Sequence, residues 1–181
     1  TFISEVPLQR WNWKTLYGDP DAINRTDCRH GAFIESVGKF DPLHFNIAPR
    51  DAALIDPQHR LALEVVWETL ENAGCNMDDM RRKKIGVFFG VERKDYSDRI
   101  REQGIDIDGH LNTGNAHAML VNRIAHFFDW TGPVQAVDAA CSSSFVALDE
   151  AIRALRSDNA KAAIVGGVHL TLSSDVNIYN R

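Results

Sequence analysis

The residues best suited to chemistry lie at 137–144, where a short apolar stretch gives way to Ala139, Ala140 and then Cys141. Three serines follow, and apolar residues then recur at helical spacing. This pattern places Cys141 where a strand ends and a helix begins. The first backbone N–H groups of a helix lack internal partners and carry partial positive charge, so a thiolate is stabilised there. We therefore predict that Cys141 is a nucleophile, with small neighbours that leave room for a substrate to approach.

The position of Cys141 also suits a small buried packing residue, with the serines acting as helix caps. The residues alone leave both interpretations open, a nucleophile or a packing residue. Cys28 and Cys75 have no comparable setting, and we expect structural or incidental roles for them. Three widely spaced cysteines without a CxxC pair favour a reducing cytoplasm over a disulfide framework. They also argue against a zinc site, so we expect no metal.

Composition excludes several classes of protein. Of the 181 residues, 44% are hydrophobic and 25% are charged, as in ordinary globular proteins. The net charge of −5 argues against a nucleic-acid binder, and the basic cluster at 81–84 reads as a solvated loop. No apolar run reaches the ~18 residues of a spanning helix, and the first residues do not resemble a signal peptide. We expect a cytoplasmic protein that binds neither nucleic acid nor membrane.

The clearest predicted helix lies between Asp56 and Gly74. Asp56 suits the N-cap, Pro57 the first helical position and Gly74 the position after the end. The apolar side chains between them recur at helical spacing and predict one buried face: Leu63, Val66, Trp67 and Leu70.

Three short apolar runs, at 85–91, 134–138 and 162–168, predict buried strands of one largely parallel sheet. Helices are predicted between them, at 114–128 and from Cys141 onward, and we expect the latter helix to be buried between layers. On one side of the first helix lie His117, Leu120, Val121, Ile124 and Phe128, and in the second helix Phe145, Leu148, Ile152 and Leu155 keep the helical period. Alternating strands and helices indicate an α/β layered fold.

Residues 1–55 are predicted to be an irregular packed segment rich in aromatic and turn residues, and residues 56–181 are predicted to form the α/β core.

Four motifs resemble those of polyketide β-ketoacyl synthases (ketosynthases). Residues 138–144, Asp-Ala-Ala-Cys-Ser-Ser-Ser, resemble the family's Asp-Thr-Ala-Cys-Ser-Ser-Ser, with Ala139 in place of Thr. Residues 56–61 resemble Asp-Pro-Gln-Gln-Arg-Leu, with His59 in place of the second Gln. Residues 122–133 and the Gly-Gly-Val at 166–168 resemble the stretches before and after the nucleophile. Residues 4–20 are more similar to modular bacterial enzymes of the trans-acyltransferase type than to fatty acid synthases.

The resemblance implies a thiolase-like fold of two similar α/β halves in αβαβα layers, and a homodimer. It implies that Cys141 takes an acyl chain from the phosphopantetheine of an acyl carrier protein, with no cofactor bound by the domain itself. A carrier-bound malonyl unit is then decarboxylated, and its carbanion attacks the acyl thioester in polyketide biosynthesis. Two histidines of the second half support the decarboxylation and stabilise the oxyanion.

The resemblance also implies that this is an N-terminal portion without the family's first strand and without those two histidines. The seven histidines present match neither position, and His117 and His126 read as packing or surface residues. We therefore expect an acyltransferase fragment that is inactive in condensation by itself and that exposes a large apolar face.

Two other interpretations remain open on the sequence. A Cys-dependent thioesterase or protease would need a base beside Cys141, and whether acylation comes from thioesters or from peptides would separate it from a synthase. A decayed ketosynthase half could serve only in carrier-protein docking or dimerisation. Relatives of that non-condensing kind have Gln at the nucleophile position, which Cys141 argues against.

Overall fold

The computed structural model describes residues 2–104, 109–175 and 178, which fall into two compact units. One unit is Thr1–Gly38 with Thr171–Arg181, and the other is Lys39–Leu170. Within the described part of the chain, no helix has the length and apolar character needed to cross a membrane.

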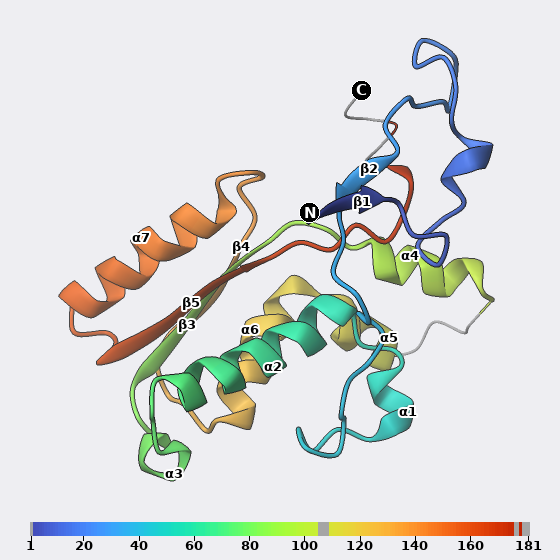
Figure 1. The fold of residues 1–181 in the computed structure, drawn as a ribbon. Helices are drawn as coiled ribbons and strands as arrows, with labels where there is room; N and C mark the ends of the chain where they lie inside the picture. The colour runs from blue at the N-terminus through green and yellow to red at the C-terminus, as the bar shows by residue number, and fades with distance from the viewer. Residues whose placement is uncertain (1, 105–108, 176–177, 179–181) are drawn as a thin grey trace. The chain divides into compact units, whose positions relative to one another are not determined.

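A three-stranded parallel sheet forms the centre of the unit Lys39–Leu170. Its strands lie in the order β4 (Val134–Val137), β3 (Ile85–Val91), β5 (Ala162–Val168) (Figure 1). Val87 of β3 is in register with Val134 on one side and Ile164 on the other. The prediction that these three runs share one sheet is confirmed, and every residue of β3 is buried.

Helices cover both faces of this sheet. α7 (Ser143–Arg156) packs on one face, and α6 (His117–Phe127) and α2 (Pro57–Asn72) pack on the other (Figure 1). The signals that predict α2 are confirmed, because the Asp56 side chain accepts a hydrogen bond from the Gln58 N–H at 2.8 Å and Gly74 has a φ of +66°. These caps satisfy backbone groups that the helix leaves without partners.

The main apolar core lies between the sheet, α2 and α6. Leu63, Val66, Val87, Leu120 and Ile124 are almost fully buried in it. An aromatic cluster contributes to this core, with ring centroids of neighbouring pairs 4.3 to 6.4 Å apart: His44, Phe45, Trp67, Phe127, Phe128 and Trp130. Large rings contribute much buried area, so this cluster is a substantial part of the core.

The helix predicted at 114–128 is two helices, α5 (Gly109–Asn115) and α6. Ala116 between them is extended, with φ −76° and ψ 127°. The Asn115 side chain donates to the carbonyl of Leu54 at 2.9 Å, which ties the break to a distant segment. The structure also describes three further helices in this unit: α1 (Pro49–Ala52), α3 (Met77–Met80) and α4 (Asp95–Glu102).

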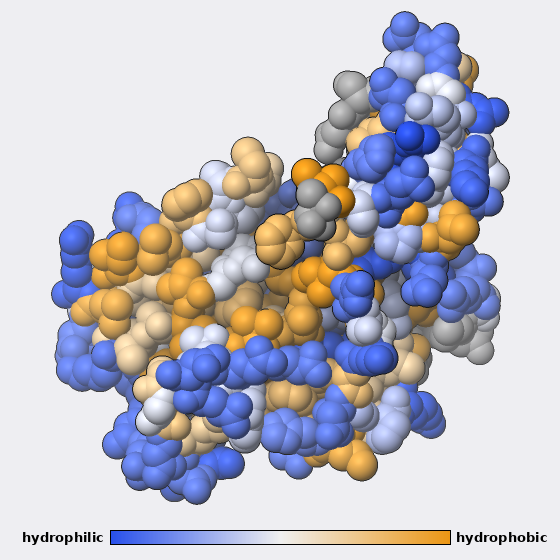
Figure 2. Space-filling model, viewed as in Figure 1, coloured by the Kyte–Doolittle hydropathy of each residue, from blue (hydrophilic) through white to orange (hydrophobic). Residues whose placement is uncertain are grey.

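α7 packs on the sheet with small side chains, and the prediction that it is buried between layers is wrong for the described residues. Its buried positions are Ser143, Ala147, Ala151 and Ala154. The large apolar residues predicted as its packed face point away, and Phe145 is 74% exposed. Apolar side chains gather around α7 and the neighbouring sheet in Figure 2. The helical period is confirmed, but the small residues face the strands because they allow a closer approach.

The strands β4 and β5 are less buried than their apolar sequences predict. Val137 is buried in β4, whereas the rest of β4 and all of β5 are exposed or half-buried. Both are outer strands of this sheet, so among the described residues each has a hydrogen-bonded neighbour on one side only.

The other unit contains a two-stranded antiparallel sheet of β1 (Ile3–Glu5) and β2 (His30–Ala32). A 3₁₀ turn, η1 (Trp13–Thr15), lies between them in sequence, and Trp13 is its buried residue. The remaining described residues before Lys39 are mostly turns and loops, as the irregular pattern of residues 1–55 predicts.

We predict that Gly90→Ala destabilises the protein by about 2–3 kcal/mol, because overpacking forces backbone shifts. A methyl group at Gly90 would lie 2.6 Å from the backbone nitrogen of Ser144 at the start of α7. Gly38→Ala is the control, since a methyl group there meets no atom within 4 Å. Urea unfolding of both variants measures the difference, and equal free energies of unfolding would contradict the close approach.

We predict that His59 makes the fold sensitive to acid. His59 is 1% exposed, and burial, with smaller contributions from the charges of Arg123 and His117, lowers its pKa to about 3 from the ordinary 6.5. The unfolded chain therefore takes up a proton at this residue below pH 6.5, whereas the folded protein does not. The stability contributed by neutral His59 is complete above pH 6.5 and is lost as the pH falls toward 3, by up to about 1.4 kcal/mol per pH unit.

His59→Gln removes this titration. The variant's free energy of unfolding should decline less than that of the unmodified protein between pH 6.5 and 4.5, as measured by urea unfolding at several pH values. Parallel curves for the two proteins would show that His59 is not held neutral.

Candidate functional site

The carboxyl ends of three parallel strands meet at one edge of the sheet, which is where α/β proteins commonly bind ligands. An open pocket of about 580 Å³ lies at this edge. It is lined by the end of β3, the turn from β4 into α7 and the end of β5: Gly90, Val91, Glu92, Ala140, Cys141, Ser143, Ser144, Gly167, Val168 and His169. The predicted nucleophile Cys141 is therefore in a pocket, on the connection from the central sheet.

The turn that carries Cys141 is tight and internally bonded. Ala140 has a φ of +50°, a left-handed conformation that costs an alanine about 1–2 kcal/mol. The Ser143 hydroxyl donates to the carbonyl of Ala140 at 2.6 Å and accepts from the N–H of Ala139 at 2.9 Å. The Ser142 hydroxyl donates to the carbonyl of Ala139 at 2.7 Å. These bonds hold the strained turn and leave the Cys141 side chain exposed.

Cys141 lies immediately before the helix N-cap. α7 begins at Ser143 with Ser142 as its N-cap, so the helix starts two residues later than the cysteine. This agrees with the predicted helix start near Cys141 and places the thiol beside the first turn, where the N–H groups and the positive end of the helix dipole lie. The thiol is exposed, so the reading of Cys141 as a buried packing residue is wrong.

Glu92 and His169 line the same pocket and were missed by sequence reasoning. Each directly follows a predicted strand, Glu92 after β3 and His169 after β5. That shared placement was the available signal, because parallel strands bring their carboxyl ends to one edge. Together they add a carboxylate and an imidazole to the pocket that holds Cys141.

The other histidines with described side chains do not line this pocket. His44 is in the aromatic cluster, and His59 is buried with no hydrogen-bond partner at either ring nitrogen. The Nε2 of His117 lies 3.1 Å from the carbonyl oxygen of Arg93, which fits the packing role predicted for it.

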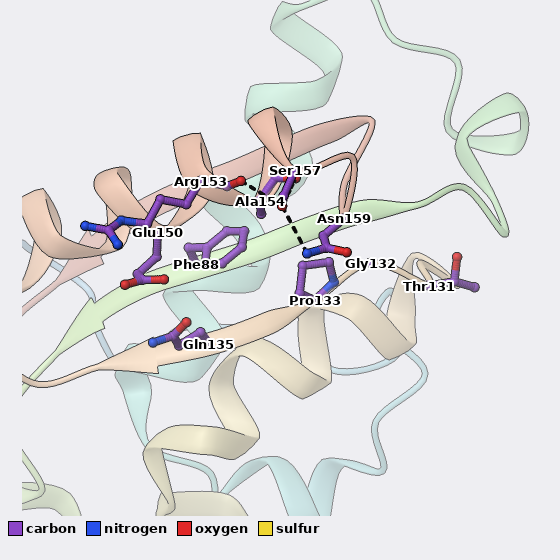
Figure 3. A pocket seen from close by; sticks show the side chains of 10 residues that line it. All are labelled: Phe88, Thr131, Gly132, Pro133, Gln135, Glu150, Arg153, Ala154, Ser157 and Asn159. Atoms are coloured by element: carbon purple, nitrogen blue, oxygen red, sulfur yellow. Dashed lines mark hydrogen bonds between the residues drawn. The ribbon is translucent and has the colours of Figure 1, made fainter.

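A second pocket, of about 470 Å³, lies between the beginning of β4 and the end of α7 (Figure 3). Glu150 and Arg153 of α7 and Gln135 of β4 contribute polar side chains to it. The hydroxyl of Ser157 donates to the carbonyl of Arg153 at 2.9 Å and accepts from the Asn159 amide at 3.0 Å, so it is engaged in local bonds. This pocket is lined by neither cysteine nor histidine and does not share a residue with the Cys141 pocket.

Within the described ranges, no group of three or more His, Cys, Asp or Glu side chains is arranged to hold a metal ion. Among the side chains that line the Cys141 pocket, the thiol is the strongest nucleophile once it is ionised.

Comparison with protein families gives a match over residues 1–178 to the family described as beta-ketoacyl synthase, N-terminal domain. Among curated proteins, the chain is 44% identical over 172 residues to a component of the phenolphthiocerol/phthiocerol polyketide synthase of Mycobacterium tuberculosis. It is 42% identical over 168 residues to the pikromycin polyketide synthase component PikAII of Streptomyces venezuelae. These alignments cover 94% and 92% of this chain but only 9% and 4% of the relatives.

Solved structures agree with these matches. An oxazolomycin ketosynthase domain of Streptomyces albus superposes with a TM-score of 0.89 at 32% identity, covering 98% of this chain and 30% of that structure. The ketosynthase from module 6 of the bacillaene synthase of Bacillus subtilis superposes with a TM-score of 0.84 at 33% identity, covering 98% and 28%. The chain therefore belongs to the β-ketoacyl synthase family, as an N-terminal part of a polyketide ketosynthase with the thiolase-like α/β fold.

Proposed function

We propose that Cys141 accepts an acyl group from the phosphopantetheine thioester of an acyl carrier protein. The observation that carries this proposal is the exposed thiol on the turn between β4 and α7, in a pocket built from three strand ends. A carrier arm is long and narrow, and an open pocket at the edge of a sheet lets its thioester reach the sulfur without unfolding the turn.

The transfer exchanges one thioester for another. The Cys141 thiolate attacks the carbonyl carbon of the acyl thioester, and a tetrahedral intermediate forms. It collapses with loss of the phosphopantetheine thiolate, which takes up a proton, and the acyl group stays on Sγ. The charge on the intermediate's oxygen needs hydrogen-bond donors, and in this proposal a backbone N–H group beside the thiol supplies one.

The condensation is a function of the parent synthase in this proposal. A malonyl unit on a carrier protein loses carbon dioxide, and its carbanion attacks the carbonyl carbon of the acyl-Cys141 thioester. The C–S bond breaks, the Cys141 thiolate leaves, and the extended polyketide chain stays on the carrier. This step needs groups that stabilise the enolate and the oxyanion, which the resemblance assigns to two histidines of the second half. The chain described here therefore performs the acyl-transfer half of the reaction, in the cytoplasm and with no cofactor of its own.

In this proposal the parent domain is a homodimer, and β4 is the strand edge at which the two copies pair. β4 is an outer strand of its sheet, and such an edge presents unpaired N–H and C=O groups to another strand. The second pocket is lined by Gln135 of β4 and by the three residues before this strand, Thr131, Gly132 and Pro133. A second copy that pairs with β4 would bury the strand edge together with these pocket residues.

We predict that Cys141→Ala abolishes the acyl adduct when the full-length parent synthase is incubated with an acyl carrier thioester. Cys141→Ser should fold but transfer more slowly, by at least about 100-fold, because an alcohol is far less ionised than a thiol near neutral pH. Intact-protein mass spectrometry measures the adduct. Release of free acid in the same reactions would indicate a thioesterase instead.

The matched controls are Cys28→Ala and Cys75→Ala, which should retain transfer within about twofold of the unmodified protein, since neither lines the pocket. An adduct of unchanged mass and yield in Cys141→Ala would assign the acyl group to another residue and refute the proposed function.

We predict that Gln135→Lys shifts the parent ketosynthase domain from dimer toward monomer, because a charged side chain on a strand edge opposes strand pairing. Gln103→Lys is the matched control, as Gln103 is also exposed but follows α4. Sedimentation velocity over a range of concentrations measures the effect. Equal dissociation of both variants, or of neither, would argue against β4 as the dimer edge.

A further inference from the structure

Gln58 in the first turn of α2 bonds with two loops that are far away in sequence. Its side chain is almost fully buried, with 1% of the residue exposed. The Nε2 donates to the carbonyl oxygen of Arg93 at 2.9 Å, and the Oε1 accepts from the N–H of Leu170 at 3.2 Å. One carboxamide therefore spans the loop after β3 and the loop after β5.

Both loops carry walls of the Cys141 pocket. Glu92 lines the pocket and directly precedes Arg93, and His169 lines it and directly precedes Leu170. Two of the three strand ends that form the pocket are thus fastened to each other through Gln58. The third, the β4–α7 turn, is fixed by its own serine hydroxyls.

The carboxamide is itself held in place. Asp56, the N-cap of α2, accepts from the Gln58 backbone N–H at 2.8 Å and from Gln58 Nε2 at 3.3 Å. The N–H of Asp56 donates to the carbonyl of Gly114 at 2.9 Å, which connects this corner to α5. His117 Nε2 is 3.1 Å from the same Arg93 carbonyl oxygen that Gln58 binds. Because the side chain is buried and bonds with both loop backbones, its length fixes the separation of the two loops.

We propose that Gln58 is a positioning residue for acyl transfer, which sets the distance between the Glu92 and His169 walls of the Cys141 pocket. The proposal rests on the function proposed above for Cys141. Gln58 does not touch the reacting atoms in this assignment, and it acts through the backbone of the two loops. A misplacement of about 1 Å at a reacting centre can reduce a rate on the order of 100-fold, so a spacer of this kind affects turnover.

The test uses the full-length parent synthase with Gln58→Met. This substitution keeps the length of the side chain and removes its hydrogen bonds to the Arg93 carbonyl and the Leu170 N–H. We expect kcat for acylation from an acyl carrier thioester to fall about tenfold or more, with KM changed less than about threefold. KM is expected to change little because a residue that is 1% exposed cannot contact the carrier protein's surface. Alkylation of Cys141 by iodoacetamide, which needs no pocket walls, should stay within about twofold of the unmodified rate.

His59→Gln is the matched control, since His59 is equally buried on the same turn of α2 and neither of its ring nitrogens has a hydrogen-bond partner. It should leave kcat within about twofold of the unmodified protein. All rates are compared well below the melting temperature of each variant, with the folded fraction checked by circular dichroism. A normal kcat for Gln58→Met, or an equal loss of kcat in His59→Gln, would overturn the positioning role.

Gln58→Glu should restore the two hydrogen bonds when its carboxyl is neutral. It also tests the positioning role if Gln58→Met does not fold. A neutral carboxyl has one donor and one acceptor and can make both bonds, whereas an ionised one cannot donate to the Arg93 carbonyl. Acylation by Gln58→Glu, relative to the unmodified protein, should therefore be several-fold higher at pH 6 than at pH 8.5. A ratio independent of pH would overturn the proposal. If the unmodified synthase forms no adduct on Cys141, the proposed function itself fails, whereas a normal adduct with unaffected Gln58 variants refutes only the positioning role.

Discussion

The close approach of α7 to the central sheet determines where the nucleophile lies. At Gly90 of β3 the backbone of the first turn of α7 is so near that a methyl group would meet it at 2.6 Å. A methyl group at Gly167 of β5 would lie 3.0 Å from the Cβ of Ser144. Alanines at positions 147, 151 and 154 continue this contact along the helix. The start of α7 thus packs against both β3 and β5. As a result, Cys141 lies where the carboxyl ends of the strands meet.

This close contact explains the exposed apolar face of α7. A helix that packs through alanines must place its larger apolar side chains elsewhere, and Phe145, Leu148 and Leu155 are exposed. Exposed apolar groups of this size are unfavourable in water, by about 25 cal/mol for each Å² left unburied. The same residues that make the contact with the sheet tight therefore leave the opposite side of the helix suited to packing against another layer.

Much of the fold could be predicted because its signals are local. Asp56, Pro57 and Gly74 mark the ends of α2 within a few residues, and the continuous apolar run of β3 indicates burial on both faces. The face of α7 could not be read in the same way. Periodicity shows that a helix has an apolar side but not which side meets the sheet, and the decision depends on Gly90, about fifty residues earlier in the sequence. The break between α5 and α6 likewise depends on a bond from Asn115 to Leu54.

The candidate site likewise has one residue with a local sequence signal and others whose role depends on contacts between distant segments. Cys141 was predictable because the strand, the small residues and the helix that define its setting are adjacent in sequence. Glu92, His169 and Gln58 were not, since their relation to Cys141 exists only once three strands have paired.

Ser142 occupies the N-cap position of α7, but its hydroxyl makes no capping hydrogen bond, and the bonds of Ser142 and Ser143 stabilise the turn instead. The Ser142 and Ser143 hydroxyls donate to the carbonyls of Ala139 and Ala140, which also accept the N–H groups of the same two serines. Each carbonyl of the strained turn thus has two donors, which helps to offset the left-handed conformation of Ala140. Because hydroxyls within the turn satisfy its carbonyls, the thiol is not needed to hold the turn together. A strained turn whose serine hydrogen bonds do not involve Sγ can keep its geometry while Sγ changes from thiolate to thioester, which acyl transfer requires.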